Sequence, residues 1–172
     1  LRDRNHLYRT LEKSVGANIM NKLLTTDEQT LKQGQVYSVA ILFCDLRGFT
    51  RLGESASAEE VILFLNDYFA DVSRVVSRYE GIINKFMGDA VLAIFGLENS
   101  ENAVEDAVNA SLAIIRHNAD FYMPNEMHPE TGVGIDFGLV VGGTIGSDER
   151  YEYTIIGDAV NKVAGLTERV KL

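Results

Sequence analysis

Apolar residues recur at a helical period in the first 34 residues of the chain. They occupy every fourth position, with charged residues between them: Leu7, Leu11, Val15, Ile19 and Leu23. This spacing places them on one face and predicts a helical lead-in over residues 1–34. The stripe is too short to indicate a coiled coil. Two interpretations stay open with equal weight: a helix packed on its own domain, or a connector or dimer seam to an upstream sensor.

A strand and a long helix are expected next. Residues 36–45 form a nearly continuous apolar run, which is typical of a buried strand. Ser57 and Glu60 then have the spacing of a capping box, which predicts a helix with Ser57 as its N-cap and Gly81 at its end. The apolar face of this helix, which we assign to the core, comprises Val61, Phe64, Leu65, Tyr68, Val72, Val75, Val76 and Tyr79.

A hairpin and a second helix are predicted after residue 81. Residues 82–95 contain two apolar stretches around Gly88 and Asp89, which is the pattern of a β-hairpin. Residues 103–117 have helical periodicity, and His117 ends that helix, where a cation suits the helix dipole and a catalytic role is not expected. The apolar face expected for this helix includes Val104, Ala107, Ala110, Ile114 and Ile115.

The remaining segments predict a loop and two strands. Residues 120–131 contain both prolines and predict a loop, in which His128 has no evident partner. Residues 132–145 and 151–156 are strand candidates. The order of elements predicts an α/β (α+β) fold, in which a mixed or antiparallel sheet is covered by helices on one side.

Composition limits the class of protein. With 172 residues, 46% of them apolar and 24% charged, the chain has the size and balance of one soluble domain. Its net charge of −9 argues against a nucleic-acid surface, because such a surface needs a basic face. The single cysteine, Cys44, excludes an internal disulfide and fits a reducing compartment.

The sequence also bears on location and completeness. Its apolar runs are too short for a membrane span, and no secretory signal is visible, so a cytoplasmic domain is expected. Because the chain begins with Leu1 rather than Met, we expect a fragment of a larger protein or a mature product. A membrane attachment of the full-length protein stays open.

Two aspartates stand where apolar strands end. Asp45 closes the first strand, and Asp89 lies near the tip of the hairpin. Aspartate is depleted in strands, and two carboxylates on adjacent strands would repel unless a cation lay between them. With no Cys/His cluster in the sequence, the pair favours a hard cation, Mg²⁺ or Mn²⁺, over zinc. The turn Gly48-Phe49-Thr50 adds backbone N–H groups for an anion, so divalent metal and phosphate chemistry are predicted.

Three motifs, in this order, give the chain a family resemblance. They are FCDLRGFT at residues 43–50, NKFMGDA at 84–90 and YTIIGDAVN at 153–161. The region that contains them resembles the class III nucleotidyl cyclases and is most similar to bacterial adenylyl cyclases. The resemblance implies a ferredoxin-like cyclase fold over residues 35–172, with a mixed, mostly antiparallel sheet and helices packed on it. Residues 1–34 would be the connector, and the active sites would lie at the interface of a homodimer.

The resemblance also implies a reaction and its metal ligands. Asp45 and Asp89 would hold two Mg²⁺ (or Mn²⁺) ions per active site, with the Leu46 carbonyl as a further ligand. One ion would activate the ribose 3′-hydroxyl, and the other would bind the β- and γ-phosphates of ATP. Attack of the hydroxyl on the α-phosphate would give cyclic AMP and pyrophosphate. The backbone around Phe49 and Thr50 would hold the triphosphate.

Base selection would depend on Lys85 and Thr154, which the opposite subunit would supply. Adenine has an acceptor at N1 and a donor at N6, so a lysine can donate to the first and a threonine hydroxyl can accept from the second. Guanylyl cyclases usually have glutamate and cysteine at these places, which suits guanine. The two residues therefore favour ATP. Asn161 would orient the ribose.

The sequence departs from the family pattern after Asn161. The family places an arginine four residues later, where it stabilises charge on the phosphates, and this chain has Gly165 there. Residues 162–172 instead resemble the family's closing strand region, so a segment between Asn161 and Lys162 is expected to be missing from the sequence. Gly132 is a second departure, because family members often have a basic residue there.

Three functions are weighed on these grounds. The favoured one is an adenylyl cyclase domain controlled by an upstream sensor or regulatory domain. A guanylyl cyclase is the first alternative, and Lys85 and Thr154 argue against it. A catalytically silent domain that only dimerises or regulates is the second. The intact pair Asp45 and Asp89 argues against a silent domain, and the missing arginine argues for it.

Overall fold

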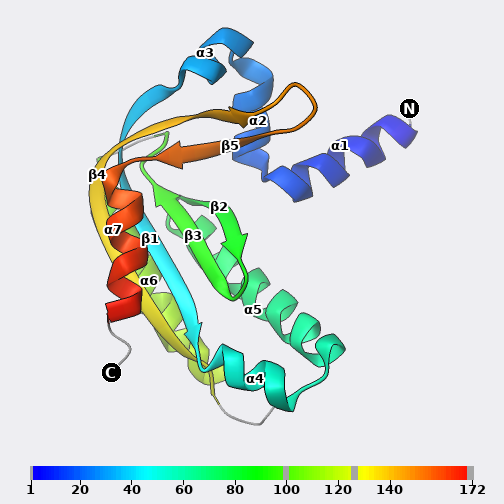
Figure 1. Ribbon diagram of the computed structural model, residues 1–172, viewed down its shortest axis with the longest axis vertical. Helices are drawn as coiled ribbons and strands as arrows, with labels where there is room; N and C mark the ends of the chain where they lie inside the picture. Colours follow the sequence, from blue (N-terminus) through cyan, green and yellow to red (C-terminus); the bar gives the residue numbers. More distant parts are fainter. Residues whose placement is uncertain (1, 99–100, 125–127, 170–172) are drawn as a thin grey trace.

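A five-stranded sheet forms the centre of the protein, seen in a computed structural model that describes residues 2–98, 101–124 and 128–169 (Figure 1). The strand order is β2-β3-β1-β4-β5, and every neighbouring pair is antiparallel. The antiparallel alternative for the sheet is therefore the correct one. The strands are β1 (Gln35–Arg47), β2 (Gly81–Met87), β3 (Ala90–Phe95), β4 (Glu130–Gly146) and β5 (Tyr151–Ile156).

Seven α-helices surround this sheet in the described part of the chain. They are α1 (Arg2–Val15), α2 (Ala17–Thr25), α3 (Glu28–Gln33), α4 (Phe49–Ser55), α5 (Ala58–Arg78), α6 (Ala103–His117) and α7 (Asp158–Arg169), with a short 3₁₀ helix, η1 (Asn118–Asp120), after α6. No helix within these described bounds is both long and apolar enough to cross a bilayer.

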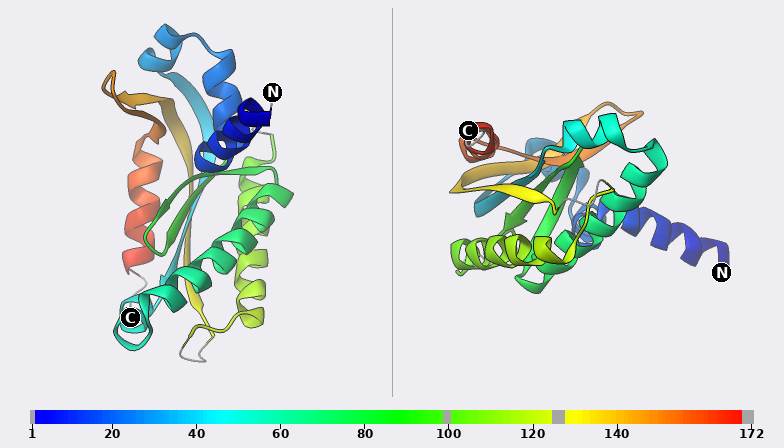
Figure 2. Two further views of the ribbon diagram at one scale, coloured as in Figure 1. Left: turned by 90° about the vertical axis from the view of Figure 1, so that its right-hand side faces the viewer. Right: turned by 90° about the horizontal axis from the view of Figure 1, so that it is seen from below.

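Helices cover both faces of the sheet, so the expectation of helices on one side is wrong. Side chains of β1 alternate between the faces: Leu42 packs with α5 and α6, whereas Ile41 packs with α7 and α2. In Figure 2 (left) α7 lies on one side of the sheet, and α5 and α6 lie on the other. The apolar run of β1 has no polar face because both of its faces are buried.

The lead-in consists of three helices rather than one. Gly16 separates α1 from α2 with a φ of +89°, a conformation that favours glycine. The apolar stripe divides at this point. Ile19 on α2 is buried in the core, but Leu7 and Leu11 on α1 are exposed, and α1 extends away from the sheet (Figure 1). Packing on the domain therefore describes α2, whereas a role for α1 as a connector stays a prediction.

Helix α5 begins as expected and ends earlier than expected. Its capping box is present: Glu60 N donates to Ser57 Oγ (3.3 Å), and Ser57 N donates to Glu60 Oε2 (2.8 Å). The helix ends at Arg78, and the residue with positive φ is Glu80 (+59°), not Gly81. Gly81 instead is the first residue of β2. Glycine is needed there because a Cβ would overlap Phe95 of β3. Close packing, and not a helix cap, explains this glycine.

Helix α6 has the expected bounds but a rotated buried face. Val104 and Ile115 are 46% and 48% exposed, so their assignment to the core face is wrong. The buried positions are Ala103, Ala107, Ala110, Ser111 and Ile114. Small residues on this face let α6 approach the sheet closely.

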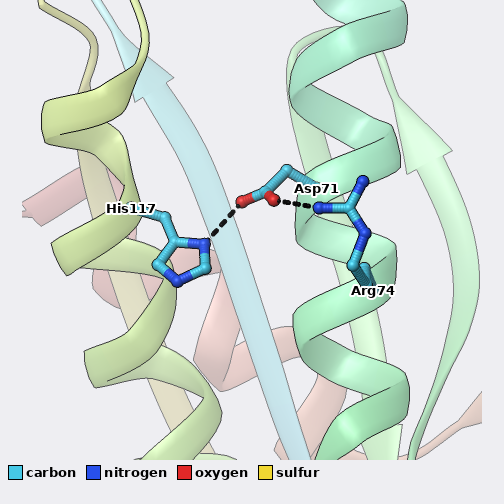
Figure 3. Close-up of polar contacts among 3 residues, drawn as sticks. All are labelled: Asp71, Arg74 and His117. Carbon is cyan, nitrogen blue, oxygen red and sulfur yellow. Dashed lines mark hydrogen bonds and ion pairs between the residues drawn. The ribbon is translucent and has the colours of Figure 1, made fainter.

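A polar contact joins α5 and α6 at the end of α6. His117 Nδ1 lies 2.9 Å from Asp71 Oδ2, and the other oxygen of Asp71 is paired with Arg74 (Figure 3). His117 thus has a partner on α5, and it ends α6 as expected. His128 has a partner as well, since its Nδ1 lies 2.9 Å from the Phe121 carbonyl oxygen.

Candidate functional site

Asp45 and Asp89 are brought together by the pairing of β1 and β3. Asp45 lies opposite Ala90 in the register, and Asp89 directly precedes Ala90 in the hairpin turn. Gly88 adopts a φ of +64° in this two-residue turn, which places Asp89 beside the end of β1. The two aspartates line a cavity of about 320 Å³ together with Leu46, Arg47, Gly48, Phe49 and Thr50. The predicted metal ligands and the predicted phosphate-binding turn therefore share one cavity.

The carboxylate of Asp45 is largely buried, and its environment favours binding of a cation. Its side chain is 16% exposed, and its Oδ1 is buried with no hydrogen-bond partner. The guanidinium of Arg47 lies nearby, with its Nε 3.9 Å from that oxygen. Burying an unpaired carboxylate oxygen is costly, so this atom indicates a missing electrophilic partner.

The donor set fits Mg²⁺ or Mn²⁺ with phosphate as co-ligand. Across the described ranges, no three His, Cys, Asp or Glu residues gather closely enough to hold a metal by themselves. Magnesium usually takes one or two carboxylates and completes its shell with water and substrate phosphates. Asp45, Asp89 and the Leu46 carbonyl would suffice as the protein's share.

Burial of the strand beside the cavity acts on Cys44. Its side chain is 1% exposed and points into the core, on the opposite face of β1 from Asp45. Burial, together with the smaller effect of the negative charge of Asp45, raises the pKa of the Cys44 thiol to about 12. Cys44 is therefore a core residue, without the thiolate character that a nucleophile needs.

A short helix, α4, replaces the expected turn after Gly48. Gly48 has a φ of +72° and is the N-cap, so Phe49 and Thr50 are the first helical residues. The first N–H groups of a helix have no intrahelical acceptor and face outward from its end. The sequence did not predict this helix because glycine has a low helix propensity, and Gly48 and Gly53 lie at its N-cap and within it. Leu52 packs this helix against the core, because its side chain is completely buried.

Lys85 and Thr154 meet although they lie on the two outermost strands of the sheet. The sheet curls so far that β2 and β5 approach each other, and Lys85 Nζ lies 3.3 Å from Thr154 Oγ1. The same Nζ lies 3.3 Å from Glu152 Oε1. Glu152 was not among the predicted residues. Its only signal is the two-residue spacing to Thr154, which places both on one face of a strand.

A β-bulge at Asn84 decides where Lys85 points. In the pairing of β2 with β3, Ile83 is opposite Ala93 and Lys85 is opposite Leu92, so Asn84 is an inserted residue. Without the insertion, strand alternation would direct Lys85 to the face covered by α5. The bulge turns it to the face that β5 approaches. No pattern in the sequence predicted this bulge.

The aspartate pair and Lys85 line separate cavities in one subunit. Lys85, Glu152 and Tyr153 line a cavity of about 900 Å³, whose other wall includes Ile19 and Met20 of α2. None of the residues lining this cavity also lines the 320 Å³ one. One chain thus keeps the predicted metal ligands and Lys85 in different cavities.

Asn161 lies in α7, and the helix runs on without a break. Residues 158–169 are helical, so the expectation that residues 162–172 form a closing strand region is wrong over the part that the structure describes. Residues 170–172 lie outside the described residues. Gly165 sits inside this helix, and a Cβ there would meet nothing within 4 Å. The family's arginine position is therefore open space.

Comparisons with known proteins agree on one family. Residues 31–170 match the family described as adenylate and guanylate cyclase catalytic domain. An uncharacterized protein of Mycobacterium tuberculosis is 41% identical over 138 residues, which are 80% of this chain and 24% of that protein. An uncharacterized protein of Mycobacterium bovis is 36% identical over 171 residues, which are 99% of this chain and 31% of that protein. The chain thus spans about a quarter to a third of the length of these relatives.

Solved structures show the same likeness. A bacterial light-regulated adenylyl cyclase has a TM-score of 0.85 and 29% identity, with 98% of this chain and 50% of that chain covered. The guanylyl cyclase Cya2 has a TM-score of 0.73 and 33% identity, with 79% and 72% covered. The adenylyl cyclase CyaB from P. aeruginosa has a TM-score of 0.72 and 31% identity, with 78% and 73% covered.

Proposed function

The chain belongs to the adenylate and guanylate cyclase catalytic domain family, and on this premise we propose that it is an adenylyl cyclase that converts ATP to cyclic AMP and pyrophosphate. The observation that favours ATP is the 3.3 Å contact between Lys85 Nζ and Thr154 Oγ1. An ammonium beside a hydroxyl offers a donor for adenine N1 and an acceptor for the N6 amine. Guanine reverses both positions and would leave these groups unpaired, which costs free energy in a buried site.

The aspartate half-site would bind the reacting end of the nucleotide. Asp45, Asp89 and the Leu46 carbonyl would hold two Mg²⁺ or Mn²⁺ ions. When bound, these ions supply Lewis acidity and neutralise phosphate charge. The N–H groups of Phe49 and Thr50 would orient the triphosphate for in-line attack of the ribose 3′-hydroxyl on the α-phosphate. Asn161 would bind the ribose and fix that hydroxyl.

A homodimer would unite the two half-sites. The separate cavities support this proposal, because in one chain the base-selecting pair does not line the cavity of the metal ligands. In a two-fold dimer each site would combine Asp45 and Asp89 of one subunit with Lys85 and Thr154 of the other. We place the domain in the cytoplasm, and α1 would connect it to an upstream sensor or regulatory domain of a longer protein.

A guanylyl cyclase and a silent domain are the competing functions. The likeness to the guanylyl cyclase Cya2 favours the first, and Gly165 in place of an arginine favours the second. The purified chain, incubated with ATP or GTP and with Mg²⁺ or Mn²⁺, separates all three by its cyclic nucleotide product. We expect cyclic AMP from ATP. Cyclic GMP formed from GTP in excess of cyclic AMP would contradict the base assignment, and no product with either nucleotide would contradict the enzyme assignment.

A further inference from the structure

Helix α6 has a second apolar face that the described part of the chain does not cover. Its buried face consists mostly of small residues, namely Ala103, Ala107, Ala110, Ser111 and Ile114. Larger apolar residues occupy the exposed side, and each is 42–48% exposed: Val104, Val108, Leu112 and Ile115. We call these four residues the α6 stripe. A surface helix normally has polar residues on the side turned away from the core, so the stripe indicates a contact surface.

The α6 stripe is separate from the candidate site. Helix α6 lies at the outer margin of the molecule (Figure 2, right). Helical spacing places the four residues of the stripe on one side of the helix over about three turns, roughly 16 Å. None of residues 103–117 lines either of the two cavities described above. Substrate binding therefore does not explain the stripe.

Two exposed charges border the stripe along one edge. Glu105 in the first turn and Arg116 in the last turn are about three turns apart, so both lie on the edge next to Leu112. If a second α6 helix packs on the stripe in the antiparallel sense about a two-fold axis, Glu105 of each copy faces Arg116 of the other. A parallel pair would place like charges opposite each other. Antiparallel helix dipoles favour the same arrangement.

We propose that a second copy of this chain docks on the α6 stripe, with the two α6 helices antiparallel. The aliphatic side chains of the two stripes would pack against each other, and the pairs of Glu105 with Arg116 would set the direction. Because each copy contributes one helix, the contact is smaller than a standard interface of about 1,200–2,000 Å² and is weak in the isolated chain. The proposal does not depend on the proposed function. In a homodimer with shared active sites, the contact would join dimers into larger assemblies.

The first test uses the single cysteine of the chain. Cys44 is buried, so a thiol introduced on α6 is the one that reacts in the folded protein. The variants Glu105→Cys and Arg116→Cys, each alone and mixed in equal amounts, are treated with a short bis-maleimide linker that cannot span about 16 Å. We expect cross-linked dimers from the mixture, with position 105 joined to position 116 in the mass spectrum, and almost none from either variant alone.

The second test disrupts the apolar surface of the stripe. Leu112→Glu puts a charge in the stripe, and Leu63→Glu makes the same change at an exposed leucine of α5 as the matched control. Sedimentation velocity over a concentration series measures the mean mass of the particles. We expect Leu112→Glu to lower this mass at high concentration relative to the parent chain, and Leu63→Glu to leave it unchanged. The melting temperature of each variant reports whether it folds.

Three outcomes would overturn the proposal. One is a mixture of the cysteine variants that cross-links no better than the separate variants. Another is cross-linking of Glu105→Cys with itself as efficiently as with Arg116→Cys, which a parallel pair or random collision would give. The third is a folded Leu112→Glu protein with the mean mass of the parent chain at every concentration. The stripe would then belong to a different occupant, such as another segment of a longer protein.

Discussion

At the scale of single residues, Lys85 has two partners on β5 at equal distance. Its Nζ lies 3.3 Å from Glu152 Oε1 and 3.3 Å from Thr154 Oγ1. Glu152 is largely exposed, so its ion pair adds little stability, but it helps to hold the ammonium beside Thr154. An incoming adenine would meet a lysine that is already directed by both partners.

Exchanging Lys85 and Thr154, the proposed base-selecting pair, is expected to shift substrate preference. In the double variant Lys85→Glu with Thr154→Cys, the donor and acceptor pattern suits guanine, so we expect cyclic AMP formation to fall by about tenfold to a hundredfold. Cyclic GMP formation should rise relative to it. Product analysis with equal ATP and GTP measures the ratio. Lys32→Glu, the same charge reversal at an exposed lysine, should leave the ratio unchanged.

An unaltered product ratio in the double variant would show that other residues select the base. A general loss of both products, with an unchanged ratio, would have the same meaning, provided that the variant has the melting temperature of the parent chain.

Cys44 is expected to resist alkylation in the folded protein. Its thiol is buried and its pKa is raised to about 12, so almost no thiolate exists at pH 8. Because the chain has one cysteine, mass spectrometry after iodoacetamide treatment gives an unambiguous count. We expect no adduct in buffer and one adduct in denaturant. An adduct formed in buffer as fast as in denaturant would contradict the burial of β1.

The same shift has a consequence for stability against pH. The unfolded thiol ionises near pH 9, whereas the folded thiol stays protonated to about pH 12. Between these values the folded state binds more protons than the unfolded state, so the free energy of unfolding falls as pH rises above 9. Below pH 9 this residue contributes no pH dependence.

At the scale of elements, Gly81 and Gly165 show that the local sequence does not reveal how tightly a glycine is packed. Gly81 was expected to end a helix and instead begins β2 against the core. Gly165 was expected in a strand region and instead lies inside α7. Only the packing around each backbone distinguishes them, because a Cβ at Gly81 would lie 2.7 Å from Val76 Cγ1 and a Cβ at Gly165 would meet nothing.

Alanine at these glycines should have opposite effects. Gly81→Ala forces a methyl group into a filled core and should lower the free energy of unfolding by about 1–3 kcal/mol. Gly165→Ala removes backbone entropy from the unfolded chain at an open helical site and should raise it by about 0.5–1 kcal/mol. Urea denaturation of both variants measures the difference. Equal effects of the two substitutions would contradict the packing described for Gly81 or the helix described for Gly165.

Elements also differed in how well the sequence predicted them. The capping box of α5 and the hairpin of β2 and β3 depend on neighbouring residues, and both were found where expected. Helix α4 was missed because the glycines at its N-cap and within it predict a turn rather than a helix. Burial of Leu52 in the core stabilises the helix despite them. The buried face of α6 was misplaced because apolar residues occur around more of that helix than the core covers.

At the scale of the whole molecule, the curled sheet brings its two edges together. Strands β2 and β5 are the outermost strands, yet they share the contact of Lys85 with Thr154 and, through Ile82 and Ile155, one hydrophobic core. Asp45 lies near the end of β1 and Asp89 in the turn that leads into the neighbouring strand β3, and the two line a different cavity. This arrangement is the physical basis for expecting each active site to need two chains.

Mixing two inactive variants should therefore restore activity. Asp45→Ala and Lys85→Ala each impair one half-site, and the mixed dimer has one site in which both halves are intact. After unfolding and refolding at equal concentrations, half of the dimers are mixed and each has one working site of two, so about a quarter of the parent activity is expected. Cyclic AMP formation measures it. Activity no higher than that of the separate variants would contradict the shared site.

The sequence by itself determined the periodic helices and strands, the two aspartates at strand ends and the motifs that indicate a cyclase. These depend on short-range spacing, which a linear pattern records. Only the tertiary structure decided that helices cover both faces of the sheet, that a bulge directs Lys85 to Thr154, and that Gly132 makes room for Arg47. Each of these depends on which strands pair and in what register, and residues far apart in the chain settle that together.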